Sequence, residues 1–306
     1  MATMYEDMPN EEYHATEWAI SSSGLRLLAK SPRHFWAQYR APMRPQRTQT
    51  AAQLLGSAVH CAVLEPGVFD ARYVMVPEGI DRRTKDGKAL FAQIEASGKT
   101  PLSFDVWHHV IDMASAVAQS PEWQMIAAMG KAEHSIFWQD EETGVHCKIR
   151  PDLHIPPCLK YPAGLIVDVK TVGDASPEGF GAQCWRQDML IQAAFYADGF
   201  RAQYGTTEDP VFMWLPIETE WPYCHALYDV RQPAAPVMAG DTEVMAAPDL
   251  LGYGRGVVRD LLQLYADCTR TSIWPGYKMH APLVLPGYAM KTINAEQFGE
   301  VEISYE

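Results

Sequence analysis

The stretch VHCKIRPDLHIPPCLKYPAGLIVDVK, residues 145–170, decides the fold that this sequence predicts. Apolar and polar side chains alternate from Val145 to Asp152, which is the period-two pattern of a half-buried strand. A connection rich in Pro and Gly follows, and residues 165–170 then form a second, more apolar strand. Asp168 and Lys170 alternate onto one side of it. The stretch therefore predicts a carboxylate at the end of each of two neighbouring strands, with an ammonium group beside the second.

The segments around this stretch predict an α+β fold with a mixed, mostly antiparallel sheet and helices packed on it. Residues 134–139 form a hairpin with the first strand, through a turn at 141–144. Further strands are expected at 211–217 and 223–230. Helices are expected at 51–65, within 105–129 with a restart at Pro121, at 177–204 and at 250–268.

No internal repeat, low-complexity tract or flexible linker divides the chain, so we expect one elaborated domain over residues 1–306. It comprises a basic helical N-terminal segment at about 18–64, a core at about 51–230 and a helical or extended C-terminal extension at about 231–306. The acidic residues of the extension, Glu296, Glu300, Glu302 and Glu306, are expected to keep the protein in solution.

Charge is distributed unevenly along the chain. The formal net charge of −13 would ordinarily count against nucleic-acid binding, because Lys and Arg supply most of the affinity for phosphates. From Trp18 to Leu64, however, there is no Asp or Glu and the charge is +6, which leaves −19 for the rest. Ser21 to Ser23 form an N-cap signature and Pro32 restarts a helix, so two short helices carry most of this basic block.

Composition also excludes several classes of protein. No stretch approaches the roughly 18 consecutive apolar residues of a membrane-spanning helix, and residues 1–10 lack a signal-peptide pattern. We therefore expect a cytoplasmic protein without a membrane partner. Six separated cysteines without a CxxC pair argue against a zinc ribbon, an iron–sulfur cluster or a disulfide framework, and are expected to be reduced and mostly buried: Cys61, Cys147, Cys158, Cys184, Cys224 and Cys268.

The paired strand ends predict metal-dependent chemistry. Carboxylates from two adjacent strands, Asp152 and Asp168, can converge on a hard divalent cation, which prefers oxygen ligands. Lys170 projects to the same side, where an ammonium group can orient a metal-bound water and stabilise charge developing on a phosphate. Alone, an Asp-x-Lys pair at a strand end is more often a surface turn.

Two helices carry further candidate residues. His60 lies in the middle of the 51–65 helix, and Gly56 on the same face leaves room for an ion or a closely packed strand. Glu65 is a poor ligand because five helical positions rotate it about 140° away from His60. Gln192 and Tyr196 are spaced i and i+4 and project together from a largely apolar helix. Each feature alone is more often structural, and the order of all four along the chain favours a site.

At these residues the chain resembles the PD-(D/E)xK nuclease superfamily, whose core signature matches Pro151-Asp152 and Asp168-Val169-Lys170. The GSAVH run that ends at His60 and the QAAFY run at 192–196 resemble the RecB-like branch. Within that branch, ISSSGLRLLAKSP and LLGSAVHCAVLEP resemble RecE, the exonuclease VIII group of phage and prophage recombination enzymes. The resemblance covers about residues 13–204, and the cluster-binding cysteines of the iron–sulfur relatives are missing.

The resemblance implies a restriction-endonuclease-like core with a mixed central sheet flanked by helices. It implies a 5′→3′ exonuclease that acts on double-stranded DNA ends, depends on one or two Mg²⁺ ions or on Mn²⁺, and releases mononucleotides. The remaining 3′ single strand would go to an annealing protein of the RecT type. The resemblance further implies a ring-shaped homo-oligomer, a trimer or tetramer, in the cytoplasm of a bacterial host.

Residue by residue, the resemblance assigns the metal to His60, Asp152, Asp168 and the Val169 carbonyl, and catalysis to Lys170. Gln192 and Tyr196 match the helix motif that supports the lysine and the substrate. Glu133 stands where relatives often carry an acid, as a second-metal or supporting residue.

For DNA, the sequence offers phosphate-binding candidates in three places. Ser21, Ser23 and Arg26 at a helix start are expected to hold the terminal 5′ phosphate, with Lys30 further along the same helix. Arg150, on the catalytic strand, is expected to contact the scissile or adjacent phosphate. The exposed loop 82–88 is a candidate for strand separation through Arg82 and Arg83.

Three alternatives stay open at this point. The same scaffold serves restriction-type and junction-type endonucleases. A non-catalytic protein that binds DNA ends would keep the carboxylates as structural residues. A metallohydrolase acting on small molecules suits the acidic composition, but the basic block and the absence of an HExxH motif argue against it.

Overall fold

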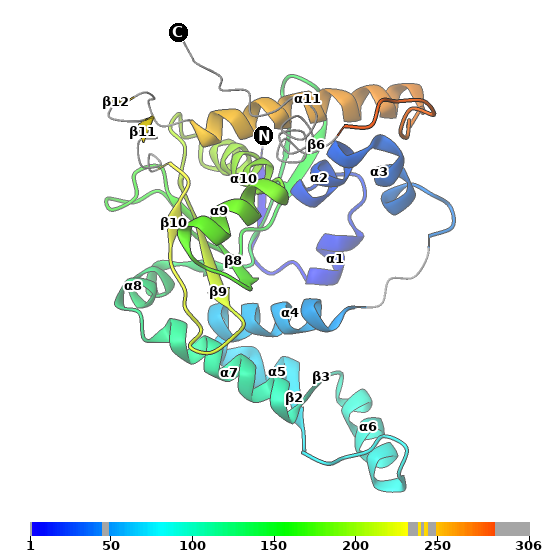
Figure 1. Cartoon of the computed structure of the whole chain (residues 1–306), viewed down its shortest axis with the longest axis vertical. Coiled ribbons are helices and arrows are strands. Elements are labelled where there is room, and N and C mark those ends of the chain that lie inside the picture. The colour runs from blue at the N-terminus through cyan, green and yellow to red at the C-terminus, as the bar shows by residue number, and fades with distance from the viewer. Residues whose placement is uncertain (1, 45–48, 232–237, 240–241, 244–248, 285–306) are drawn as a thin grey trace, which may run out of the picture.

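A five-stranded mixed sheet forms the centre of the computed structural model, which describes residues 2–44, 49–231, 238–239, 242–243 and 249–284 (Figure 1). Its strand order is β10-β9-β8-β7-β4. The strands are β4 (Lys131–Ala132), β7 (Leu153–Ile155), β8 (Leu165–Val172), β9 (Val211–Glu218) and β10 (Tyr228–Asp229). Only β8 and β9 run parallel, and the other neighbours are antiparallel. The predicted α+β fold with a mixed sheet is confirmed.

A second sheet carries the predicted hairpin. It pairs β1 (Thr3–Tyr5), β5 (Ser135–Gln139) and β6 (His146–Ile149) in the order β1-β5-β6. The expected single strand at 145–152 is wrong in one respect. β6 ends at Ile149 and β7 begins at Leu153 in the other sheet, so Pro151 and Asp152 lie in the bend between the two sheets. Proline lacks an N–H group and restricts the residue before it, which ends β-sheet pairing at this point.

Helices cover both faces of the central sheet. On one face lie α9 (Pro177–Arg186), α10 (Met189–Tyr204) and α11 (Leu250–Thr271), and on the other α4 (Ala51–Leu64), α7 (Phe104–Ala118) and α8 (Pro121–Met129) (Figure 1). The side chains of β8 alternate between two apolar cores: Ile166 packs in the α10 core, and Val167 and Val169 pack in the α4 core. Asp168 and Lys170 have the same parity as Ile166 and so face α10.

Local signals explain where the main helices begin and end. Thr50 forms a capping box with Gln53 at the start of α4, and the helix ends before Pro66, close to the expected 51–65. The expected helix at 177–204 is instead broken at Asp188, whose backbone is left-handed (φ 50°), which separates α9 from α10. α11 crosses α10 closely at Gly254, where a Cβ would lie 2.4 Å from the Leu190 carbonyl oxygen.

The other elements lie along the N-terminal half and at the periphery. They are α1 (Asn10–Ala15), α2 (Ser22–Lys30), α3 (Pro32–Tyr39), a 3-10 turn (Pro66–Val68), α5 (Phe69–Arg72), β2 (Tyr73–Val76), α6 (Lys85–Ser97), β3 (Thr100–Ser103), β11 (Met238–Ala239) and β12 (Thr242–Glu243). α6 projects at one end of the long axis (Figure 1). The expected loop at 82–88 is therefore partly helical, because Thr84 caps α6. The expected strand at 223–230 pairs over Tyr228–Asp229 and at an isolated bridge between Ile217 and His225.

Two expectations concern the whole chain. Within the described ranges, no helix is both long and apolar enough to cross a membrane. All six cysteines are free thiols, three of them buried, two half-buried and one, Cys224, exposed. The four acidic residues of the C-terminal extension lie outside the described residues, as does part of the basic block at residues 45–48.

Candidate active site

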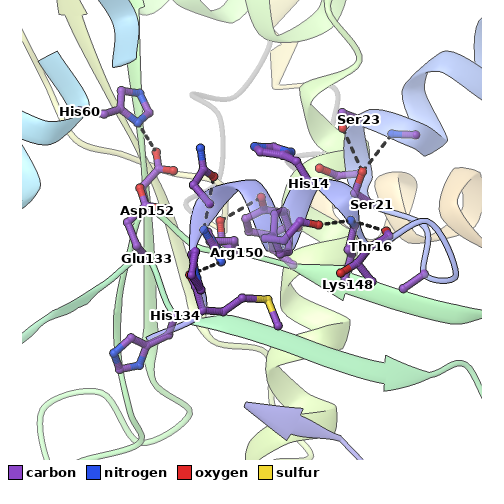
Figure 2. Close-up of a pocket in the computed structure, with 18 of the residues that line it drawn as sticks. His14, Thr16, Ser21, Ser23, His60, Glu133, His134, Lys148, Arg150 and Asp152 are labelled. Carbon is purple, nitrogen blue, oxygen red and sulfur yellow. Dashed lines mark hydrogen bonds and ion pairs between the residues drawn. The ribbon is translucent and has the colours of Figure 1, made fainter. Parts of the chain in front are cut away.

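A pocket of about 840 Å³ lies between α4, the start of α2 and the segment at residues 6–20. Figure 2 shows His60, Glu133 and Asp152 gathered on one side of it, with Ser21 and Ser23 on the opposite side. The pocket therefore joins two of the predicted metal ligands, His60 and Asp152, to the predicted phosphate-binding helix start, whereas Asp168, Val169 and Lys170 do not line it.

Three potential ligands converge at one side of the pocket. His60 Nδ1 lies 3.5 Å from Asp152 Oδ2, and one donor atom each of His60, Glu133 and Asp152 lies within 4.8 Å of the other two. α4 passes close to β8 at Gly56, where a Cβ would be in ordinary contact with Thr171 Oγ1 at 3.5 Å. In the part of the chain that the structure describes, these three residues are the group of His, Cys, Asp or Glu side chains arranged to hold a metal ion, and we call them the metal group.

The backbone fixes the two carboxylates of this group. Asp152 Oδ2 accepts a hydrogen bond from the Val169 N–H at 2.7 Å, which links the bend before β7 to β8. Glu133 follows β4 with a left-handed backbone (φ 57°), and its N–H donates to the Asp152 carbonyl at 3.2 Å. Glu133 is thus a principal member of the group, whereas the sequence marked it as a second-metal or supporting residue.

The electrostatics of this group fit a divalent cation. Burial, and then the neighbouring Asp152 charge, raise the pKa of Glu133 to about 8. Burial also raises the pKa of Asp152, which His60 lowers and Asp168 raises again. Carboxylate oxygens and an imidazole nitrogen are suitable ligands for a divalent cation, and a bound cation would offset the repulsion between the acids.

Asp168 and Lys170 are paired beside this group. Asp168 is 2% exposed, and its Oδ2 contacts the Lys170 ammonium group. Its Oδ1 accepts a hydrogen bond from Gln192 Nε2 on α10 at 2.6 Å. The expected ligand set of His60, Asp152 and Asp168 is therefore modified: Glu133 completes the close group, and Asp168 is held by Lys170 and Gln192.

The Val169 carbonyl lies on the edge of β8 that faces Asp152, as expected if it is a metal ligand. The N–H and C=O of one strand residue point to the same edge, and the Val169 N–H is bonded to Asp152. On the opposite edge, the carbonyls of Gly164 and Val172 bond to residues in and just after β9. Residues of odd number in β8 therefore direct their backbone groups toward Asp152.

Tyr196 supports the bend that carries Asp152. It lies one turn after Gln192 on α10, is buried, and donates from its hydroxyl to the Arg150 carbonyl at 3.2 Å. Burial raises the pKa of its hydroxyl well above the ordinary value, so this group stays a hydrogen-bond donor. Gln192 and Tyr196 thus act on adjacent parts of the site, as their spacing predicts.

The start of α2 lines the pocket with Ser21, Ser23 and Arg26. Ser21 Oγ caps the helix by accepting from the Gly24 N–H at 3.3 Å and lies 2.9 Å from Ser23 Oγ. Arg26 reaches the Gln187 carbonyl at 3.5 Å, at the junction of α9 and α10. Lys30 is exposed at the other end of α2 and does not line the pocket.

Arg150 differs from its expected role. It is 7% exposed and donates to Ser135 Oγ at 2.8 Å, the Met8 carbonyl at 2.8 Å and Asn10 Oδ1 at 3.3 Å. Its guanidinium group therefore holds the N-terminal segment and is not directed at a phosphate. Strand alternation places Arg150 on the polar face but does not reveal that another segment covers this face.

The remaining predicted residues lie away from the metal group. Arg82 stacks on the Phe91 ring, with its guanidinium carbon 3.8 Å from the ring centroid, and Arg83 pairs with Asp81 at 2.8 Å. Both stand at the start of α6 and do not line the pocket. Glu65 lines the pocket and accepts hydrogen bonds from Arg72 at 2.5 and 3.0 Å.

The fold and the site are those of the PD-(D/E)xK superfamily, whose nucleases generally use divalent metal ions. Residues 21–278 match the family model of the PDDEXK-like domain of unknown function DUF3799, and the chain belongs to this family. Among solved structures, it is similar to a protein of Eubacterium rectale described as a "putative exonuclease". The two chains share 15% identity at a TM-score of 0.53, over 96% of this chain and 99% of the other, a likeness in fold. No curated protein matches.

Proposed function

We propose that the protein is a Mg²⁺-dependent 5′→3′ exonuclease of the RecE type. It would degrade linear duplex DNA to mononucleotides and leave a 3′ single strand. The observation that carries the proposal is the convergence of the His60, Glu133 and Asp152 donors with the Asp168–Lys170 pair. The structurally similar protein of Eubacterium rectale is described as a "putative exonuclease", which supports an exonuclease activity for this chain.

Each residue of the site has a part in the proposed hydrolysis. His60, Glu133, Asp152 and the Val169 carbonyl would hold the cation, with Asp168 beside them. When bound, the cation polarises the scissile phosphate and lowers the pKa of the attacking water. The Lys170 ammonium, held by Asp168, stabilises negative charge at the phosphate and orients the water. Gln192 fixes Asp168 so that it presents one oxygen to Lys170.

The start of α2 is the proposed binding site for the 5′-terminal phosphate. Ser21, Ser23 and Arg26 line the same pocket as the metal group, and the free N–H groups of a helix start attract an anion. A terminal phosphate bound there would leave the first phosphodiester near the metal group. This arrangement would set the polarity of digestion.

The decisive experiment compares end-labelled linear duplex with closed circular duplex, each with and without Mg²⁺. The proposal expects Mg²⁺-dependent release of acid-soluble nucleotides from linear DNA and intact circles. Asp168→Ala and Lys170→Ala should abolish release while circular dichroism shows the fold retained. Nicked circles would indicate an endonuclease, and end binding without release would indicate a non-catalytic protein. Continued digestion by Asp168→Ala would remove the assignment of the site.

The proposal extends to assembly and partners. A ring-shaped trimer or tetramer around DNA would make digestion processive, and an annealing protein of the RecT type would take up the 3′ strand. Light scattering of the purified protein tests the ring, since a monomer that digests processively would contradict it. Co-migration of an annealing protein with the nuclease on 3′-tailed DNA tests the partner.

A further inference from the structure

The N-terminal arm, residues 2–20, crosses the hairpin and forms one wall of the pocket. It begins with β1 paired to β5, continues through α1, and ends where the Ile20 N–H and carbonyl bond to His146 and Lys148, both at 2.8 Å. Eleven of the pocket's lining residues belong to it, from Glu6 to Ile20. The arm lies outside the residues matched by the family model.

Two buried cations hold the arm in place. Lys148, 5% exposed, donates from Nζ to the carbonyls of Tyr13 at 2.5 Å and Thr16 at 2.7 Å. Arg150 bonds to Met8 and Asn10. Both cations also lie over the Tyr13 ring, at 4.5 and 4.4 Å from its centroid. Because neither cation is free for a ligand, this face of the hairpin serves to fix the arm.

The arm is strongly acidic. It contains five Asp or Glu residues and no Lys or Arg. Glu6, Asp7 and Glu17 line the pocket, and Glu17 is paired with Arg44 at 2.6 Å. Glu6 and Asp7 follow β1 and lie close enough to His134, the residue after Glu133, for their charges to act on its imidazole and raise its pKa, although burial lowers it overall. This wall of the pocket therefore carries two carboxylates, and the cations that line the pocket from other elements are Arg26, Arg72, Lys148 and Arg150.

We propose that the arm is an end stop: its fixed backbone and the Glu6 and Asp7 carboxylates keep a second phosphodiester from passing the metal group. This inference rests on the proposed exonuclease function and deepens it. A strand entering from the open side can then advance by only one nucleotide, so each cut releases a mononucleotide. The acids repel the next phosphate, and the backbone blocks a continuous strand from running through.

The test measures the lengths of the products released from 5′-labelled duplex. In Glu6→Gln/Asp7→Asn, we expect the ratio of dinucleotides and longer products to mononucleotides to rise roughly fivefold, as removal of like-charge repulsion in a solvated pocket allows. The matched control is Glu11→Gln/Glu12→Gln, which removes the same charge from the same arm at residues that do not line the pocket. An unchanged ratio in the first variant, or a changed Mg²⁺ requirement without longer products, would overturn the end stop.

A second variant tests the fixed backbone. Lys148→Met removes both ammonium contacts with the arm while keeping an unbranched apolar chain. We expect faster cleavage of the arm by a Glu-specific protease, together with longer products. Mononucleotides alone from a protein whose arm is readily cleaved would refute the end stop. A wild-type protein that releases no nucleotides would instead refute the exonuclease function, so the two failures are distinguishable.

Discussion

Replacing Glu133 with Gln should stabilise the metal-free protein at pH 8 and remove much of its response to divalent cations. In the folded protein, burial and the Asp152 charge raise the pKa of Glu133 from 4.5 to about 8. Between these values the folded state binds a proton that the unfolded state has lost. The free energy of unfolding therefore falls as the pH rises through this window, and Gln removes this contribution.

The size of the effect follows from the same values. A rise from 4.5 to about 8 corresponds to about 5 kcal/mol at 1.36 kcal/mol for each pH unit. Water in the open pocket reduces this, so we expect about 2 kcal/mol at pH 8. For a chain of this length that is a Tm increase of roughly 4 °C. At pH 5 the increase should be small, because this pH is only just above the unfolded-state pKa of 4.5 and most of the loss accumulates at higher pH.

The assay is thermal unfolding in EDTA from pH 5 to 8.5, followed by titration with Mg²⁺ at pH 8. Wild type should gain stability with Mg²⁺, whereas Glu133→Gln should gain much less, because one anionic ligand is missing. The control is Glu95→Gln, an exposed glutamate on α6. The reasoning is refuted if the two variants show the same pH dependence, or if Glu133→Gln responds to Mg²⁺ like wild type.

Two further substitutions test separate parts of the site. Gln192→Leu removes the hydrogen bond to Asp168 and should lower kcat roughly 10-fold to 100-fold, the usual effect of losing a side chain that orients a residue of a metal site. The measurement is the rate of nucleotide release as a function of Mg²⁺ concentration. A variant with the same maximal rate and the same Mg²⁺ dependence as wild type would contradict this role. Arg26→Ala should slow digestion of 5′-phosphorylated duplex more than of 5′-hydroxyl duplex, with Lys30→Ala on the same helix as the control. Equal losses on both substrates would show that Arg26 contacts the backbone generally.

Local sequence signals were sufficient for the parts of the site that lie on single elements. The capping residues at Thr50 and the stop at Pro66 define α4, so the position of His60 on a helix could be predicted. Strand alternation placed Asp168 and Lys170 on one side of β8, where they do pair. The i and i+4 spacing of Gln192 and Tyr196 likewise follows from helix geometry. These predictions required no knowledge of how the elements pack.

The rest depended on tertiary structure. Glu133 joins the metal group because the two-residue strand β4 pairs with β7, and two residues show no periodicity. Arg150 is buried because the N-terminal arm, far away in sequence, covers its face of the hairpin. The break at Asp188 requires a left-handed backbone, which Asp tolerates, but the presence of an Asp does not predict this conformation. The positions of Glu133 and Arg150 are thus set by partners at long sequence separation.

The distribution of charge along the chain now has a physical explanation in the pocket. The acidic arm is followed at once by the basic segment, and both meet the same cavity, through Asp7 on one wall and Arg26 on another. A polyanion is then attracted at the start of α2 and repelled at the arm, with buried carboxylates between them. Those carboxylates repel one another and also repel DNA, so a bound divalent cation would reduce both repulsions at once. Metal binding, stability of the site and admission of the substrate are consequently expected to be one coupled equilibrium in this protein.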